Sequence, residues 1–145
     1  TENVAAILTF VSALLLAEKL KSKENLRLRN LQKYFIEKLK KNINGAIING
    51  SEVNRLPNNI NVSFAGAEGE SLLLMLDEAG ICCSTGSACS AQDLNPSHVL
   101  LAIGTPLELA HCSLRFSLGR FTTKQEIDYT LKQLKVAVNR IRGIS

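Results

Sequence analysis

The sequence predicts an α+β fold in which helices cover a small mixed or antiparallel sheet of few strands. Two helical patterns at the ends of the chain, and several short alternating segments between them, carry this prediction. The length of 145 residues suits one domain, and the content of 46% hydrophobic and 21% charged residues is ordinary for a globular protein. The composition therefore excludes wholesale disorder, and we expect residues 1–145 to form a single small domain.

A helical periodicity dominates residues 1–44. Apolar residues recur at helical spacing between Val4 and Leu15 and again between Leu28 and Leu39, before Asn44-Gly45 gives a C-cap signal. The polar stretch 19–25 between these runs predicts a break or an exposed turn. One uninterrupted helix would be about 60 Å long. We therefore expect a long kinked helix, or a helix pair, that bridges to something outside this chain.

Residues 45–145 are expected to form the α+β core. Strands are expected at 60–64 and 113–118, where apolar and polar residues alternate, and at the short runs 46–48, between turn residues, and 81–83, after Gly80. Helices are expected at 70–79, at 95–103 with Asn95 as N-cap and Pro96 as first residue, and after 123. The last helix begins at the capping box Thr123–Glu126 and continues with apolar residues at helical spacing.

The charge pattern argues against a nucleic-acid or membrane partner. The net charge is +4, but no basic run is longer than two residues, and the chain has 5% aromatic residues and no Trp. The apolar run 4–17 is shorter than the roughly 20 residues that span a bilayer. A signal peptide would have Lys or Arg before its apolar run, and none precedes this one. We therefore expect a soluble, cytoplasmic protein.

Cysteine usage points to a reducing compartment with at most one special thiol. The four cysteines contain no C-x-x-C pair, and their spacing with the histidines does not resemble a zinc site, so no metal is expected. Cys82 and Cys83 are expected to be small strand hydrophobes. Cys89 lies in the small-residue run 84–90 (STGSACS), which is too poor in bulky residues to be core. From the residues alone, Cys89 is either a reactive thiol or an inert loop cysteine.

Arg115 is the second candidate, because it lies in a predicted strand between Leu114 and Phe116. Arginine is rarely fully buried unless it is paired. Its planar guanidinium suits a carboxylate, which is either a protein Asp or Glu or an acidic substrate. His98 and His111 are expected to be structural. The sequence contains no Walker loop, no G-x-G-x-x-G and no G-x-S-x-G.

Together the motifs resemble the C-terminal part of a cysteine desulfurase of the NifS/IscS type. They occur in the order and spacing of that family and cover nearly the whole chain. The stretches that carry the resemblance are 1–4 (TENV), 58–64 (NNINVSF), 68–72 (EGESL), 84–90 (STGSACS), 95–104 and 108–123 (ELAHCSLRFSLGRFTT).

The resemblance implies a homodimeric enzyme of aminotransferase class V that uses pyridoxal 5'-phosphate (PLP) on a fold-type-I scaffold. Such an enzyme converts L-cysteine to L-alanine and forms a persulfide on its own cysteine. The sulfur then goes to an acceptor such as an iron–sulfur scaffold protein. On this chain, the family motif places the persulfide cysteine at Cys89, in a catalytic loop 84–95. It places the substrate-carboxylate arginine at Arg115. Thr1 falls where the cofactor phosphate is contacted from the neighbouring subunit.

The family's large PLP-binding domain, with its lysine, is absent from residues 1–145. We therefore expect this chain to be a small C-terminal domain that is inactive alone. Cys82, Cys83 and Cys112 stand where the family more often has small apolar residues or Ser. Two alternatives stay open. One is a PLP enzyme of the selenocysteine lyase type on the same scaffold. The other is a non-catalytic sulfur-carrier or interaction domain, in which Cys89 accepts sulfane sulfur without generating it.

Overall fold

A computed structural model describes residues 1–85 and 96–143 of the chain. Its centre is an antiparallel sheet with the strand order β1-β2-β3. The strands are β1 (Ala46–Ile48), β2 (Asn59–Phe64) and β3 (Ser113–Ser117). These segments agree with three of the predicted strands. In β2 and β3 apolar and polar residues alternate, which suits a sheet with two different faces.

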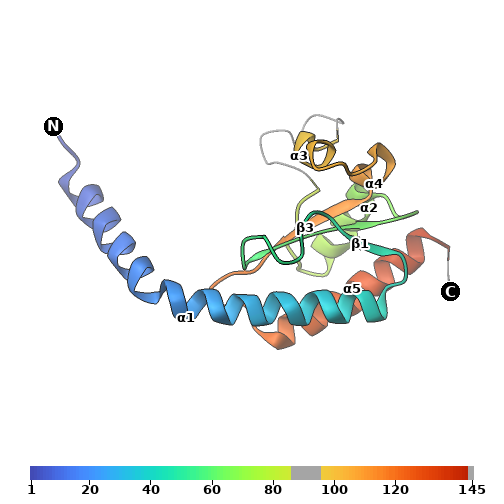
Figure 1. Ribbon diagram of the computed structural model, residues 1–145, viewed down its shortest axis with the longest axis horizontal. Coiled ribbons are helices and arrows are strands. Elements are labelled where there is room, and N and C mark those ends of the chain that lie inside the picture. The colour runs from blue at the N-terminus through green and yellow to red at the C-terminus, as the bar shows by residue number, and fades with distance from the viewer. Residues whose placement is uncertain (86–95, 144–145) are drawn as a thin grey trace.

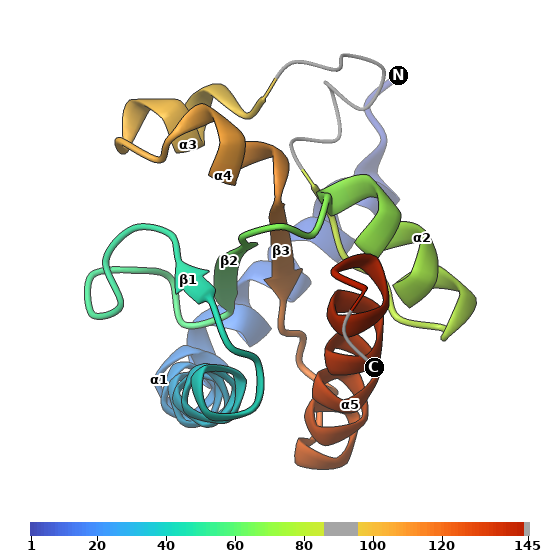
Figure 2. The ribbon, with the colours of Figure 1, turned by 90° about the vertical axis from the view of Figure 1, so that its right-hand side faces the viewer.

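Helices cover both faces of this sheet. Figure 2 shows α1 (Val4–Asn42) and α5 (Lys124–Ile141) on one side, and α3 (His98–Ala102) and α4 (Leu107–His111) on the other. The helix α2 (Gly69–Glu78) lies next to α5. The predicted α+β fold, with a few-stranded antiparallel sheet covered by helices, is confirmed.

The two faces of the sheet differ in chemistry. One face is apolar and forms one buried core with residues of α1 and α5, and the ring of Phe116 lies against that of Phe35 at a centroid distance of 5.2 Å. The buried residues of this face are Ile60, Val62, Phe64, Leu114 and Phe116. The residues between them lie on the opposite face, where Asn61 is the cross-strand partner of Arg115 and Ser63 that of Ser113. The side of the sheet that faces α3 and α4 is therefore polar.

The long N-terminal helix is confirmed, whereas the alternative of a helix pair is wrong. The helix α1 runs without a break for 39 residues, and Figure 1 shows that its axis changes direction within its N-terminal half. The stretch 19–25 does not end it, because Lys, Glu and Leu, which make up most of the stretch, favour helix even where their side chains contribute little to a core. Gly45, with φ at 72°, follows its C-terminal end, where the Asn-Gly pair predicted a cap.

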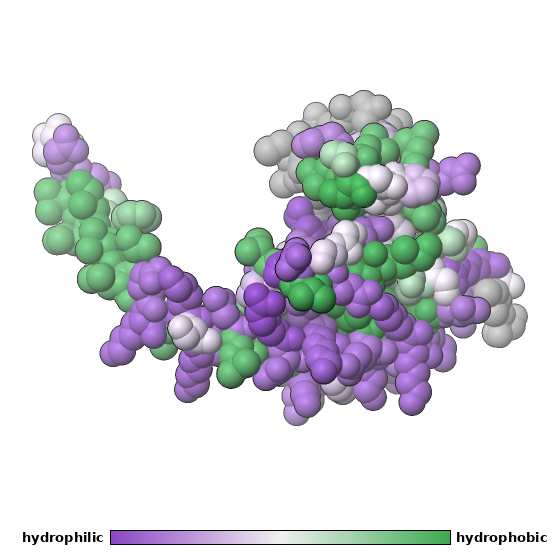
Figure 3. Space-filling model, viewed as in Figure 1, coloured by the Kyte–Doolittle hydropathy of each residue, from purple (hydrophilic) through white to green (hydrophobic). Residues whose placement is uncertain are grey.

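Only the C-terminal half of α1 contributes to the core. Leu28, Leu31, Phe35, Ile36 and Leu39 are buried, whereas every residue from 1 to 19 is exposed. Figure 3 shows the apolar side chains gathered on the N-terminal half of α1. They are Val4, Ile7, Leu8, Phe10, Val11, Leu14, Leu15 and Leu16. Across the described residues, no helix combines the length and the apolar character needed to cross a bilayer.

Arg27 fastens α1 to the segment that connects β3 with α5. Its guanidinium donates hydrogen bonds to the backbone carbonyls of Gly119 (2.9 Å), Arg120 (2.9 Å) and Thr122 (2.8 Å). It also pairs with Glu24, with 2.6 Å between Nη2 and Oε1. These bonds satisfy three carbonyls of the loop between β3 and the Thr123 cap of α5, and so they fix the end of the strand that carries Arg115.

Two predicted elements differ from the structure, and one element was not predicted. Residues 81–83 form no strand, since only Ser84 bridges to Arg115, through N–H···O bonds of 3.1 and 2.6 Å. The helix α3 begins at His98 with Ser97 as N-cap rather than at Pro96, and Asn95 lies outside the described residues. The helix α4 has five residues, which is too short for a periodic pattern to indicate it.

Candidate functional site

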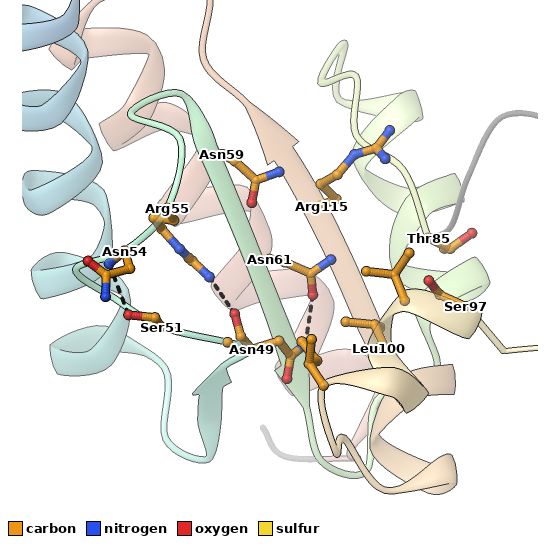
Figure 4. Close-up of a pocket in the computed structure, with 13 residues that line it drawn as sticks. Asn49, Ser51, Asn54, Arg55, Asn59, Asn61, Thr85, Ser97, Leu100 and Arg115 are labelled. Atoms are coloured by element: carbon orange, nitrogen blue, oxygen red, sulfur yellow. Dashed lines mark hydrogen bonds between the residues drawn. The ribbon is translucent and has the colours of Figure 1, made fainter.

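A cleft of about 380 Å³ lies on the polar face of the sheet, between the β1–β2 connection and α3 (Figure 4). Asparagine and serine side chains supply much of its wall, and Val99, Leu100 and Ile103 of α3 add an apolar border. Two arginines, Arg55 and Arg115, line it, whereas no Asp or Glu is among the described residues that do. The cleft therefore favours a ligand that carries negative charge.

Arg115 reaches the cleft from the middle of β3. Its backbone is held on both sides, by β2 through the pairing with Asn61 and by the bridge with Ser84. Its side chain is half-buried and makes no hydrogen bond or ion pair with another described residue. The sequence left two partners open for Arg115, a protein carboxylate or an acidic substrate, and no described Asp or Glu pairs with its side chain. This leaves the guanidinium available for an external carboxylate.

Arg55, which sequence reasoning missed, approaches the cleft from the connection between β1 and β2. Its Nη2 donates to the backbone oxygen of Asn49, while its Nε and Nη1 are buried and have no hydrogen-bond partner among the described residues. Burial lowers the pKa of this guanidinium, and the charge of Glu52 opposes the shift only in part. Because Nε and Nη1 are buried, Arg55 affects the cleft mainly through its positive charge and through its hydrogen bond to the backbone oxygen of Asn49.

A cluster of uncharged polar side chains lies next to Arg115, and two of its members, Asn49 and Asn61, line the cleft. Asn49 is 5% exposed and Ser63 is fully buried, and both join Asn61 in a hydrogen-bonded network. Sequence reasoning missed these three residues as site residues. The signal that was available is the alternation of β2, which places Asn61 and Ser63 on the face that carries Arg115.

The cysteines fall into different environments. Cys89 lies outside the described residues. Cys82 is exposed and lies in no strand, so the prediction of a small strand hydrophobe is wrong for it. Cys83 packs partly against the core, and burial raises its pKa to about 11. Its thiolate is therefore scarce at neutral pH, and Cys83 is a poor nucleophile.

The remaining candidates are not among the described residues that line the cleft. Thr1 is exposed at the free end of α1, distant from the sheet in Figure 1, and is not brought together with Arg115. His98 and His111 are both exposed. Among the residues that the structure describes, no group of three or more His, Cys, Asp or Glu is arranged to hold a metal ion.

The donor set of the cleft fits the carboxylate of a substrate but not the anchoring of PLP. PLP needs a lysine for its covalent attachment and an acidic partner for its pyridine nitrogen. Neither a lysine nor an acid is among the described residues that line the cleft. The cleft can thus hold and orient an acidic substrate, whereas a cofactor would have to be held by residues elsewhere.

Comparison with known proteins shows the family to which this chain belongs. The family model of class-V aminotransferases matches residues 1–130. The chain is 52% identical to the cysteine desulfurase IscS of Dictyoglomus turgidum and 45% identical to cysteine desulfurase IscS 1 of Archaeoglobus fulgidus. All of this chain is covered in both cases, but only 37% and 38% of those proteins.

Solved structures give the same result. A NifS-like protein superposes with a TM-score of 0.82 at 27% identity, over 97% of this chain and 35% of that one. A NifS-like protein of Rickettsia africae gives 0.79 at 29% identity, over 99% and 36%. The chain thus spans little more than a third of the length of these relatives. It belongs to the class-V aminotransferase family and, within that family, resembles the cysteine desulfurases of the NifS/IscS type.

Proposed function

We propose that this chain is the small C-terminal domain of a PLP-dependent cysteine desulfurase, a transferase that converts L-cysteine to L-alanine. The observation that carries the proposal is the cleft around Arg115, whose described lining includes two guanidinium groups and no acid. The similarity to proteins named cysteine desulfurase over the whole of this chain supplies the substrate class. In this proposal, Arg115 binds and orients the carboxylate of the substrate.

Cys89 is proposed as the nucleophile that receives sulfur. Its thiolate attacks the sulfur of the bound cysteine, and a new S–S bond forms as the bond between that sulfur and the β-carbon breaks. The electron pair of the broken bond stays on carbon, which takes up a proton and becomes the methyl group of alanine. The products are a Cys89 persulfide and L-alanine, so sulfur is transferred with no external oxidant. When bound, PLP supplies the electron sink that stabilises the negative charge on carbon.

The exposed apolar side chains of α1 support the proposal of a larger protein. Eight large apolar residues between Val4 and Leu16 are exposed, which is unusual for one helix of a stable domain. We propose that this half of α1 packs against the PLP-binding domain, and that Thr1 contacts the cofactor phosphate of the neighbouring subunit in a homodimer. A reducing cytoplasm is the proposed compartment, because four cysteines in 145 residues are too few for the disulfide framework of a small secreted domain. An iron–sulfur scaffold protein is the proposed sulfur acceptor.

The polypeptide that joins this chain to its PLP-binding domain provides the direct test. It would be incubated with L-cysteine, alanine and sulfide would be measured, and mass spectrometry would locate added sulfur. We expect equal amounts of alanine and transferred sulfur, with the extra sulfur atom on Cys89. Preference for selenocysteine in direct competition would favour the lyase alternative. Sulfur appearing on Cys89 only when another sulfurtransferase is present would favour a carrier domain.

The isolated 145-residue chain is expected to release no alanine from L-cysteine, even with added PLP. The cleft binds the carboxylate, but no lysine is among its described lining residues to anchor the cofactor. Alanine would be measured by chromatography after long incubation, against free PLP as the background. Turnover at the rate of an enzyme would contradict the division of work between two domains.

Replacing Arg115 with alanine in the joined polypeptide is expected to raise KM for L-cysteine about 100-fold, because charge-assisted bonds to the carboxylate are lost. The Arg115→Lys variant keeps the charge but cannot bind the carboxylate in a bidentate way, so KM for L-cysteine is expected to rise about tenfold. Arg120→Ala is the matched control, since Arg120 is exposed, its guanidinium stacks over Phe121, and it is not among the described residues that line the cleft. Steady-state kinetics that leave Arg115→Ala indistinguishable from the control would remove Arg115 from the site.

A further inference from the structure

We propose that the carboxamide of Asn61 is a second carboxylate-binding group of the cleft, and that a buried chain of hydrogen bonds fixes the way it faces. The inference rests on the proposed function, because the ligand is the carboxylate of the amino-acid substrate. It assigns Asn61 as a binding residue beside Arg115. It assigns Asn49 and Ser63 as positioning residues that act through Asn61.

The chain of bonds starts at a backbone carbonyl, which can only accept. The oxygen of Leu109 in α4 accepts from the hydroxyl of Ser63 at 2.8 Å. The hydroxyl oxygen of Ser63 accepts from Nδ2 of Asn49, also at 2.8 Å. The second hydrogen on Nδ2 of Asn49 goes to Oδ1 of Asn61, at 2.7 Å. Because the Leu109 carbonyl can only accept, Ser63 donates to it, and the direction of each following hydrogen bond in the chain is then fixed.

The opposite direction of these bonds is disfavoured. Reversal of the Asn49 carboxamide would put its Oδ1 where Nδ2 now lies, 2.8 Å from Ser63 Oγ, and would turn the single hydrogen of Ser63 towards that oxygen and away from Leu109. Two oxygens, Ser63 Oγ and the carbonyl of Leu109, would then face each other at 2.8 Å with no hydrogen between them. Ser63 is fully buried and Asn49 nearly so, so water cannot relieve the mismatch.

The fixed direction determines what Asn61 offers to a ligand. Its oxygen is occupied by Asn49, so its NH₂ group is left to donate. Figure 4 shows the Asn61 oxygen on the side of Asn49 and its nitrogen turned the other way, towards β3. Asn61 and Arg115 are directly paired across β2 and β3, and both line the cleft. Side chains so paired start about 5 Å apart at their Cβ atoms, close enough to share one carboxylate.

A carboxylate gains from this arrangement more than other small groups do. The two oxygens of a carboxylate offer about four acceptor positions, and a bidentate arginine occupies two of them. A neutral N–H donor on the neighbouring strand adds a further bond and restricts rotation of the carboxylate. No acid among the described lining residues competes for these donors.

The decisive variant is Asn61→Asp in the polypeptide that joins this chain to its PLP-binding domain. This substitution keeps the size of the side chain and an oxygen for Asn49 to donate to, so folding is expected to be preserved. It replaces the donor that faces the cleft with a negatively charged acceptor. KM for L-cysteine is expected to rise about 10- to 100-fold, with a much smaller change in kcat, because substrate binding is what is lost.

Cysteamine, which is cysteine without its carboxylate, separates carboxylate binding from general damage to the site. Its dissociation constant, measured by the absorbance of the bound cofactor, is expected to be roughly the same for wild type and Asn61→Asp. An equal loss of affinity for cysteamine and L-cysteine would overturn the assignment of Asn61.

Two buried serines provide a matched pair for the positioning role. Ser63 and Ser113 are cross-strand partners, both fully buried, and each donates to a carbonyl of α4, but only Ser63 bonds to Asn49. Ser63→Ala is expected to raise KM for L-cysteine several-fold, because the Asn49 carboxamide is then free to reverse. Ser113→Ala is expected to lower the melting temperature similarly and leave KM unchanged.

The outcomes distinguish this inference from the proposed function. If the wild-type protein turns over L-cysteine but Asn61→Asp keeps its KM, the inference alone fails. Equal KM values for Ser63→Ala and Ser113→Ala would remove the positioning role. A wild-type protein that neither binds nor turns over L-cysteine would contradict both.

Discussion

Substitution of Cys89 by serine is expected to abolish desulfuration in the polypeptide that joins this chain to its PLP-binding domain, lowering sulfide and alanine release about a thousandfold or more. A serine hydroxyl is not ionised at neutral pH and forms no stable bond to sulfane sulfur, whereas an ordinary cysteine is a few per cent thiolate. Binding of L-cysteine is expected to persist, because Arg115 and its cleft are unchanged. Cofactor absorbance would report binding, and sulfide release with a physiological reductant would report turnover.

Cys82→Ser is the matched control for this experiment. Cys82 is exposed and only seven positions away, so it is the described cysteine most able to substitute for Cys89 as a thiol. Cys83 is not a competitor, since burial raises its pKa to about 11. Full activity is expected for Cys82→Ser. Undiminished sulfide release from Cys89→Ser would show that another thiol, or none, receives the sulfur.

Replacement of Gly69 by alanine is expected to have the largest effect on stability. A Cβ built on Gly69 would lie 2.8 Å from the backbone oxygen of His111 and 2.9 Å from that of Ser113. Both atoms are backbone, at the end of α4 and the start of β3, so neither can rotate away. Exchange of Gly for Ala within a helix would by itself stabilise by about 0.5–1 kcal/mol. Overpacking costs about 1–3 kcal/mol or more, so we expect a net loss of stability.

The expected readout is a fall of several degrees in the melting temperature, since about 1 kcal/mol corresponds to about 2–4 °C in a domain of this size. Thermal unfolding of the isolated chain, followed by circular dichroism, would measure it. Gly119→Ala is the control, because its Cβ would meet only Thr122 Oγ1 at an ordinary 3.7 Å. Equal melting temperatures for the two variants would mean that α2 moves away from α4 without cost.

The sequence predicted those elements whose pattern is long or bounded by clear turns. The strands 46–48 and 60–64 and the helix after the Thr123 capping box agree with the structure, and the capping box itself is formed. The predicted break at 19–25 failed because turn-like polarity was taken for a loop in a stretch whose residues favour helix. The strand predicted at 81–83 failed because a three-residue apolar run does not show whether a partner is beside it.

The candidate site was predictable only in part. Arg115 was identified because a charged residue between two apolar ones in a strand needs a partner. Asn49 and Ser63 were not, since their importance depends on the carbonyl of Leu109, which is 46 positions from Ser63 in the chain. The donor-to-acceptor direction of these hydrogen bonds is set by tertiary packing, and no local pattern in the sequence indicates it. The assignments of Cys89 and Thr1 stay predictions, which the experiments above address.

The unequal burial along α1 implies that this helix does not unfold as one cooperative unit. Its C-terminal half is anchored by Leu28, Leu31, Phe35 and Leu39 in the core and by Arg27 on the loop after β3. Beyond that anchor, the N-terminal half is held by its own backbone bonds and the Asn3 cap, which give a helix of this length only marginal stability in water. In the isolated chain, amide protons there should exchange orders of magnitude faster than those after Leu28. A neighbouring domain that covers this half would extend the cooperative unit to the first turn of the helix.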